Sequence, residues 1–332
     1  MVKQPSREED HLMVQFLIKR LLGLLFIVLG VTFITFMLGY FAPSDPIKEM
    51  MGEHFDFQSW QQLRHFYGFD LPWYQQYFNF LLRLLRFDLG TSFHPQQRAV
   101  WDIIKDGVPI SVELALWGTV VTLSLGIPVG IWSALKANTW VDTLNMGVAL
   151  TLYALPVFIL TIFVQIAILW VNKAGISWPI IGWGTPWQYS WSDLQYKLAP
   201  ILTYAAGGYA YYARLTRTTL LEVLRQDYIR TARAKGLREQ MVIYRHALRN
   251  AIIPLITVIG LLLGLLVTGS FFIEAVFGIP GVARITVNAV FQRNYPVIQA
   301  TTILIAIGVV LGNLFADVLY HLVDPRIKTE DQ

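Results

Sequence analysis

The ionisable residues of this chain are few, and their spacing does not match a hydrolytic or phosphate-binding site. The sequence contains no Gly-Lys dipeptide, so it has no Walker-type phosphate loop, and neither His-Glu-x-x-His nor Gly-x-Ser-x-Gly occurs. The six histidines are dispersed, and three of them (His54, His65 and His94) fall in one polar segment. We therefore expect no catalytic residue, no metal and no bound cofactor in this chain.

Three carboxylates lie within or beside long apolar runs, where an ionisable group costs about 3 kcal/mol or more. Glu113 and Glu274 are expected near the outer ends of such runs, where they can reach water. Asp317 has Asn313 one turn before it and His321 one turn after it. An ion-driven carrier could use this set as a proton or sodium relay, but the position of Asp317 near an inner end favours a structural hydrogen bond.

A basic segment, Tyr228 to Arg238, could receive force from a soluble partner. Nothing breaks a helix from 221 to 235, and apolar residues recur there at three- and four-residue steps, while Arg230 and Arg233 share another face. Gly236 can end this helix because it adopts a positive φ at little cost.

A second helix is expected after the glycine, with Met241, Tyr244 and Leu248 on one side and Arg245 and Arg249 on another. Pro254 can then open the next apolar run, where its missing N–H costs little. Simple positive charge on the inner membrane face explains the arginines but not the two faces around a central glycine. A docking helix that enters a groove of a partner explains both.

Six apolar runs surround these residues, and each approaches the roughly 20 residues that cross a bilayer. The chain has 332 residues, of which 55% are hydrophobic and 14% charged, so we predict an all-α integral membrane protein. The runs are 21–42, 109–134, 143–172, 199–222, 251–276 and 298–323. The fourth is the least apolar, and its Arg214 and Arg217 are expected to face water.

The charge distribution predicts the orientation. With the amino terminus inside, the inner segments carry 16 Lys and Arg residues, whereas the short outer loops 173–198 and 277–297 carry 4. Both termini are therefore predicted to be cytoplasmic, residues 1–20 as a poorly ordered arm and 324–332 as a tail. The net charge of +4 follows from this bias, so no nucleic acid is needed to explain it.

Two further segments lie between the apolar runs. Residues 43–108 are too polar to span and place aromatic residues and charges at helical spacing, so we expect a helical segment outside the membrane. The loop 173–198 carries four tryptophans, for which anchoring in the headgroup region is favoured over stacking on a substrate. They are Trp178, Trp183, Trp187 and Trp191.

Glycine and proline predict how the spans pack. Gly126 and Gly130, and likewise Gly260 and Gly264, are small residues four apart that allow close helix approach. Pro128 and Pro156 are expected to kink the second and third spans.

The basic segment resembles the EAA loop of ATP-binding-cassette importer permeases, in its oligopeptide/dipeptide form. Where the general loop has Glu-Ala-Ala before a glycine, this chain has Arg230-Thr-Ala232 and Gly236. Other motifs of this branch follow in order. They are Pro43-Ser-Asp-Pro46, Gly68-Phe-Asp-Leu-Pro72, Asp88-Leu-Gly-Thr-Ser-Phe93, Phe277-Gly-Ile-Pro-Gly281, Tyr295-Pro-Val-Ile-Gln299 and Asp324-Pro-Arg-Ile327.

The resemblance implies a B-type permease subunit of a bacterial or archaeal plasma membrane. The subunit would form half of a pathway with a homologous C-type permease, within surrounding membrane lipid. Two cytoplasmic ABC ATPase subunits, which use ATP and Mg²⁺, would grip the loop 223–250 in the permease core 109–323. An extracytoplasmic binding protein would deliver the peptide.

The resemblance and the helix pattern together select candidate residues. The ATPase-coupling residues are Tyr228, Arg230, Thr231, Ala232, Arg233, Ala234, Lys235, Gly236, Leu237 and Arg238. Tyr228 and Ala232 either enter the partner's groove or pack toward the membrane. Polar residues of the spans could line the pathway or bond neighbouring helices. They are Gln165, Thr268, Ser270 and Asn313.

Three rival functions differ in what drives transport. The sequence favours an ATP-driven importer of dipeptides or oligopeptides, with nickel or another small solute as the alternative cargo. An ion-driven carrier that depends on Asp317 is a second class, and a membrane scaffold without transport is a third.

Overall fold

The computed structural model describes residues 7–42, 45–51, 55–93, 98–256, 258 and 271–323, with only the backbone for 7–21 and 315–323. Several predictions lie outside this part of the chain: half of the fifth span, the Gly260 and Gly264 pair, and the tail 324–332.

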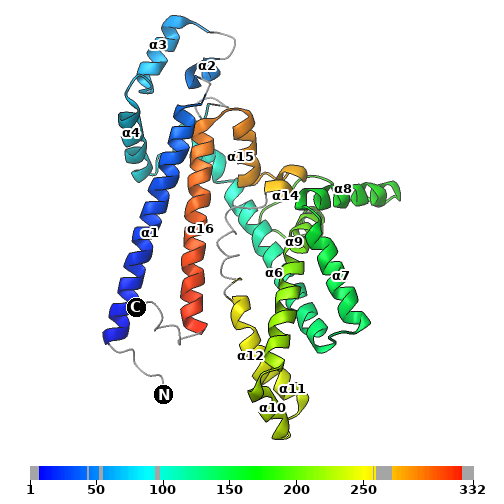
Figure 1. Ribbon diagram of the computed structural model, residues 1–332. Helices are drawn as coiled ribbons and strands as arrows, with labels where there is room; N and C mark the ends of the chain where they lie inside the picture. Colours follow the sequence, from blue (N-terminus) through cyan, green and yellow to red (C-terminus); the bar gives the residue numbers. More distant parts are fainter. Residues whose placement is uncertain are drawn as a thin grey trace. The chain divides into compact units, whose positions relative to one another are not determined.

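Helices make up the regular structure of the described residues, apart from one isolated antiparallel bridge between Thr91 and Ala99 (Figure 1). The helices are α1 (Arg7–Tyr40), α2 (Pro46–Met51), α3 (Phe57–Phe66), α4 (Trp73–Leu85), α5 (Val100–Ile104), α6 (Gly107–Leu135), α7 (Trp140–Ala154), α8 (Val157–Lys173), α9 (Trp191–Leu224), α10 (Asp227–Ala234), α11 (Glu239–Met241), the π-helix η1 (Val242–Ala247), α12 (Leu248–Ala251), α14 (Phe271–Val276), α15 (Val282–Phe291) and α16 (Tyr295–Val323).

The chain forms two compact units. The first comprises Met1–Gly107 and Ile285–Val310, and the second comprises Val108–Arg284 and Leu311–Gln332. The residues with the strongest functional predictions lie in the second unit.

Three helical stretches of the described residues are long and apolar enough to cross a membrane. They are Leu22–Tyr40, Val100–Leu135 and Tyr295–Leu314, and the bent pair α7 and α8 adds a fourth if it is one span. Helix α9 has the length, with 34 residues, but is not among them, because polar and charged residues interrupt its apolar sequence. The predicted number of six spans therefore stays a prediction.

The third predicted span is broken rather than kinked. Helices α7 and α8 meet at 104°, because Leu155 before Pro156 adopts an extended conformation with φ −80° and ψ 121°. The proline ring disfavours the α conformation in the residue before it. In contrast, α6 continues through Pro128 without a break.

The amino-terminal arm also differs from the prediction, since α1 begins at Arg7 and makes most of residues 1–20 helical. No glycine or proline interrupts the sequence after Arg7 until the apolar run has begun. The acidic residues Glu8, Glu9 and Asp10 lie in the first turn, where the helix dipole favours negative charge.

In the first unit, the predicted helical segment 43–108 forms the short helices α2 to α5. Ile47 and Phe93 are its buried centre, with Trp60 and Tyr67 packed against them. Asp45 accepts a 2.9 Å hydrogen bond from the Trp60 indole. The predicted helicity is confirmed, while the side of the membrane on which this segment lies stays a prediction.

In the second unit, small residues bring α6 against α9. A Cβ added to Gly130 would lie 2.5 Å from the carbonyl oxygen of Ala213, and one added to Gly126 would lie 2.9 Å from Cβ of Tyr212. Real Cβ atoms do not approach this closely, so both positions require glycine. The predicted packing role of the Gly126 and Gly130 pair is confirmed.

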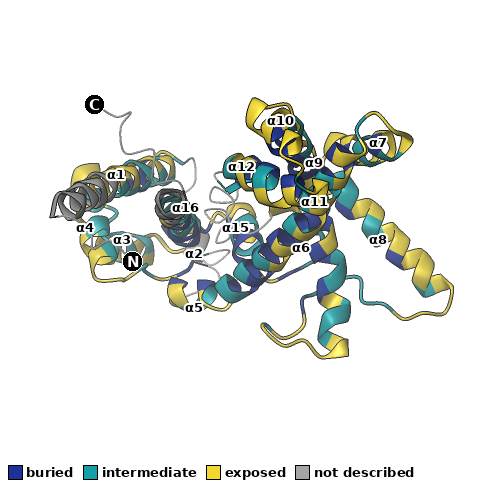
Figure 2. Cartoon of the chain, turned by 90° about the horizontal axis from the view of Figure 1, so that it is seen from below, coloured by how far each residue is buried: buried dark blue, intermediate teal, exposed yellow. Residues whose placement is uncertain are grey.

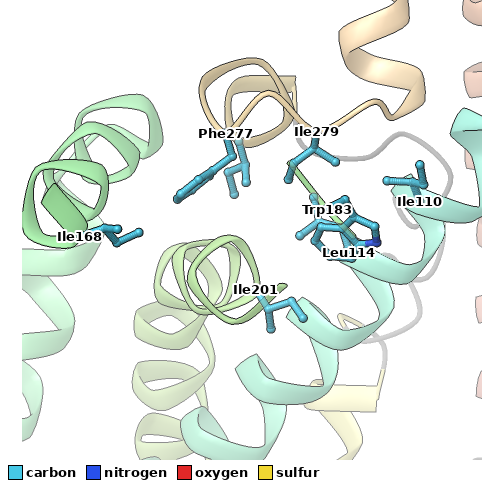
Figure 3. Packing of buried hydrophobic residues seen from close by; sticks show 8 residues of the cluster. Ile110, Leu114, Ile168, Trp183, Ile201, Phe277 and Ile279 are labelled. Atoms are coloured by element: carbon cyan, nitrogen blue, oxygen red, sulfur yellow. The ribbon is translucent and has the colours of Figure 1, made fainter. Parts of the chain in front are cut away.

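One buried cluster of the second unit lies at one end of these helices. It contains Ile110 and Leu114 of α6, Ile201 of α9, Phe277 and Trp183 (Figure 3). Buried residues run along α9, whereas α8 is mainly intermediate and exposed (Figure 2). Helices α6 and α9 therefore form the rigid centre of this unit.

Candidate coupling segment and a buried charge cluster

The predicted coupling segment folds as a helical hairpin at the end of α9. Helix α9 ends at Leu224, and Gln226 adopts an extended conformation (φ −70°, ψ 150°) before α10 begins at Asp227. The prediction of one unbroken helix over 221–235 is therefore wrong. Asp227 in the first turn favours a new helix start at this point.

The apolar face of α10 is buried within the chain itself. Ile229 and Ala232 pack with Leu220, Val242 and Ala247 in one cluster. Ala232 therefore packs internally, which decides one of the two alternatives for this residue. Tyr228 is 42% exposed, and its hydroxyl accepts a 2.7 Å hydrogen bond from the side-chain amide of Asn250.

Gly236 forms the turn of the hairpin. Its φ is +76°, in the left-handed region predicted for it, and no atom lies within 4 Å of where a Cβ would be. Conformation rather than space therefore requires glycine here.

An ion pair closes this turn. Arg233 donates hydrogen bonds of 2.7 and 3.1 Å to the two oxygens of Glu239. The hydrogen bond from Arg233 is the main reason why the pKa of Glu239 lies below its usual value. Arg233 thus makes these two hydrogen bonds within the hairpin, although the sequence predicts that Arg233 contacts the ATPase.

The remaining predicted coupling residues present a mainly basic surface. Arg230, Thr231, Ala234, Lys235 and Arg238 are exposed, while Leu237 is half-buried against the apolar cluster. Arg230 has only a 3.5 Å contact with the fully solvated carboxylate of Asp227, three residues away, which contributes little. We call these five exposed residues the coupling surface.

The second arm of the hairpin is not an ordinary α-helix. Residues Val242–Ala247 form a π-helix between α11 and α12. Val242, Ile243 and Ala247 are buried, whereas Met241 and Tyr244 are exposed. The expected apolar side, with Met241 and Tyr244, is therefore exposed in this chain, and Val242, Ile243 and Ala247 are the residues that the second arm buries.

Of the four predicted pathway residues, the structure describes Gln165 and Asn313. Gln165 donates a 2.8 Å hydrogen bond to the carbonyl of Val276, as expected for a residue that bonds neighbouring helices. Asn313 is half-buried. Thr268 and Ser270, and the side chain of Asp317, lie outside the described residues.

A buried charge cluster in the second unit was missed from the sequence. Lys197 of α9 lies 2.7 Å from Glu113 of α6, and both side chains are fully buried. The Lys197 ammonium also donates to the carbonyls of Thr185 and Gln188, at 2.8 and 2.7 Å. We call Glu113, Lys197, Trp183 and Trp187 the Glu113 cluster.

The other carboxylate oxygen of Glu113 holds the loop before α9. It accepts from the Trp183 indole at 2.9 Å and from the backbone N–H of Trp187 at 3.0 Å. The expectation that Glu113 reaches water is wrong. Trp183 is not an interfacial anchor, since it is 2% exposed. Trp187 and Trp191 are exposed, and their anchoring in the headgroup region stays a prediction.

Glu274 is also buried, contrary to the expectation that it reaches water. It accepts a 2.7 Å hydrogen bond from Ser111, and Ser111 in turn accepts from the backbone N–H of Val282. A Cβ on Gly281 would lie 2.4 Å from Glu274 Oε2. The family motif around Gly281 is thus a turn built around a buried carboxylate.

A third ion pair links α7 with α9. Arg217 donates to both oxygens of Asp142, at 2.7 and 2.6 Å. Arg214 is exposed, as predicted, but Arg217 is only 24% exposed in its side chain, so the expectation that it faces water is wrong. No feature of the sequence pairs residues 75 apart, as these are.

The helical structure of the described residues and their long apolar spans are those of an integral membrane protein. Two family models match the chain, one for the binding-protein-dependent transport system inner membrane component over residues 126–329 and one for the N-terminal part of such components over 13–115. The chain belongs to this family of membrane transport components.

Named relatives match along nearly the whole chain. The dipeptide transport system permease protein DppB of Bacillus subtilis (strain 168) is 35% identical over 95% of this chain and 98% of its own length. The glutathione transport system permease protein GsiC of Pectobacterium atrosepticum is 35% identical over 95% of this chain and 99% of its own.

A solved structure shows the same fold at lower identity. The inward-facing MetNI methionine ABC transporter contains a chain that is 20% identical, with a TM-score of 0.55. The match covers 67% of this chain and 96% of that chain. This likeness concerns the fold alone.

Proposed function

We propose that this chain is a permease subunit of an ATP-driven importer of dipeptides or oligopeptides. The names of its relatives support the cargo, since they are dipeptide, oligopeptide and glutathione permeases. The subunit forms half of the pathway with a homologous C-type permease in a bacterial or archaeal plasma membrane, and both of its termini are cytoplasmic. An extracytoplasmic binding protein presents the peptide.

The coupling surface carries the proposal for the mechanism. Two ATPase subunits bind ATP and Mg²⁺, and one of them takes α10 into a groove. The apolar face of α10 is already occupied by its own chain, so the partner meets Arg230, Thr231, Lys235 and their neighbours. Closure of the ATPases then moves the hairpin as one body, because the Gly236 turn and the Arg233–Glu239 pair hold its arms together.

Co-purification of the ATPase subunits with the tagged chain tests this proposal. Arg230→Glu reverses a charge on the coupling surface without touching the buried face, so we expect the ATPases to be lost while membrane insertion is unchanged. Gly236→Pro cannot adopt a positive φ and should have the same effect.

The matched control is Arg83→Glu, which reverses an exposed arginine in α4 of the first unit. We expect the ATPases to be retained in this variant. Retention in the Arg230→Glu and Gly236→Pro variants as well would contradict the proposal. Peptide uptake that persists without ATP but stops with an uncoupler would instead indicate an ion-driven carrier.

A further inference from the structure

Helix α9 runs from the Glu113 cluster to the residues before the coupling segment. Lys197 lies in its second turn, and at its other end Arg225 and Gln226 separate Leu224 from the start of α10. Its 34 residues give a length of about 50 Å at 1.5 Å per residue. One helix therefore reaches from the tryptophan loop to the hairpin.

The loop before α9 is fastened to this helix by several hydrogen bonds. Lys197 binds the carbonyls of Thr185 and Gln188, and Asp193 accepts a 2.8 Å bond from the backbone N–H of Thr185. The Glu113 carboxylate binds the same loop from the side of α6. The loop, α6 and α9 are thus joined at the buried ion pair of Glu113 and Lys197.

The conformation of Trp187 shows that the loop is held in a defined shape. Its φ is +59°, a region that costs a non-glycine residue energy and persists only where the surroundings enforce it. Its backbone N–H is fixed by Glu113, while its side chain remains 46% exposed. A tryptophan that merely anchors in lipid headgroups needs no such fixed backbone.

The packing of the rest of α9 favours movement of the whole helix when one of its ends is displaced. Gly126 and Gly130 of α6 contact it closely, and Arg217 is bonded to Asp142 of α7. Leu220 of α9 belongs to the apolar cluster that buries one face of α10. A packed helix held in this way moves as a rigid element.

We propose that Glu113 and Lys197 are positioning residues that link contact on loop 182–190 to the coupling segment through α9. The proposal rests on the proposed function, which places this loop on the outer side and the hairpin inside. The contact is made by the extracytoplasmic binding protein, and its effect is a bias between two states of the transporter.

The test uses the complete importer, reconstituted in nanodiscs with its ATPase subunits, and increasing amounts of its purified binding protein. The double variant Glu113→Leu with Lys197→Met removes both charges, a change that buried ion pairs often tolerate, but it also removes the acceptor for Trp187. We expect the basal ATPase rate to stay within about twofold and the stimulation by binding protein to fall about tenfold.

A matched control removes an exposed ion pair of the first unit. Asp102→Asn with Lys105→Met breaks a 2.5 Å contact between half-exposed side chains and should leave stimulation unchanged. If the Glu113 and Lys197 variant does not fold, two glycines inserted between Arg225 and Gln226 loosen the other end of α9, and the same loss of stimulation is expected.

Normal stimulation in either folded variant would overturn the proposal. This outcome differs from a failure of the proposed function. If the ATPases do not co-purify with the unaltered chain, the importer assignment fails. If they co-purify and stimulation survives the double variant, only the link through α9 fails.

Discussion

Two ion pairs of the second unit have the same nitrogen-to-oxygen distance of 2.7 Å but opposite surroundings. Lys197 and Glu113 are fully buried, whereas Arg233 and Glu239 keep 43% and 56% of their side-chain surface. In the buried pair each charge depends on the other and on fixed hydrogen bonds, because water cannot replace a lost partner. In the exposed pair water can do so, and the pair shapes a turn at little cost.

The largest expected effect comes from breaking the buried pair on one side. Glu113→Ala leaves the buried Lys197 ammonium without its counter-charge, and the Trp183 indole and the Trp187 N–H without their acceptor. We expect a loss of about 3–5 kcal/mol in the free energy of unfolding, measured as a lower melting temperature in detergent. The Glu113→Leu and Lys197→Met double variant should recover most of the lost free energy of unfolding. A double variant as unstable as Glu113→Ala would contradict the expected cost of leaving Lys197 buried and charged without its partner.

Glycine substitutions extend the comparison to the backbone. In Gly281→Ala the new Cβ meets the buried Glu274 and Ser111 at 2.4–2.5 Å, so overpacking costs about 1–3 kcal/mol and a disturbed buried hydrogen bond adds a similar amount. In Gly236→Ala the space is open, and only the positive φ costs about 1–2 kcal/mol. Thermal unfolding of both variants under one condition checks the order, and a larger loss for Gly236→Ala would reverse our interpretation.

A smaller effect is expected from the exposed pair. Glu239→Gln removes the charge that Arg233 binds, and we expect a change of about 0.2–1 kcal/mol in stability that decreases at high salt. Melting curves at low and high ionic strength measure it. A loss of stability as large as that of Glu113→Ala would show that solvent exposure does not determine how much each of the two ion pairs contributes.

The smallest effect is the pH dependence of this exposed pair. The hydrogen bond from Arg233 lowers the pKa of Glu239 from its usual value of 4.5. The contribution of the pair is therefore complete above that value and is lost as the pH falls through the lowered folded-state pKa. The difference in melting temperature between the chain and Glu239→Gln should shrink below pH 4.5, and an increase there would have the wrong sign.

Part of the local structure of the coupling segment was predicted from the sequence because its signals are local. The positive φ of Gly236 and the helicity around Arg230 depend on neighbours within a few residues. The break before Asp227 and the π-helix at Val242–Ala247 were missed, since each depends on how the hairpin arms pack on one another.

The Glu113 cluster could not be predicted in this way. Glu113 and Lys197 are 84 residues apart. The position of Glu113 near the end of an apolar run is also compatible with access to water. Only when α6 and α9 pack through their glycines does the lysine reach the glutamate. The pairing of Asp142 with Arg217 was missed for the same reason, because these residues are 75 positions apart and meet only after α7 and α9 pack.

The amino-acid sequence by itself determined the membrane class, the family and the position of the basic hairpin, because apolar length and short motifs are properties of contiguous residues. Tertiary structure alone decided which charges are buried together and which face of α10 remains free. Those outcomes depend on residues far apart in the chain that meet only after the helices pack, where a buried charge is stable only beside its partner.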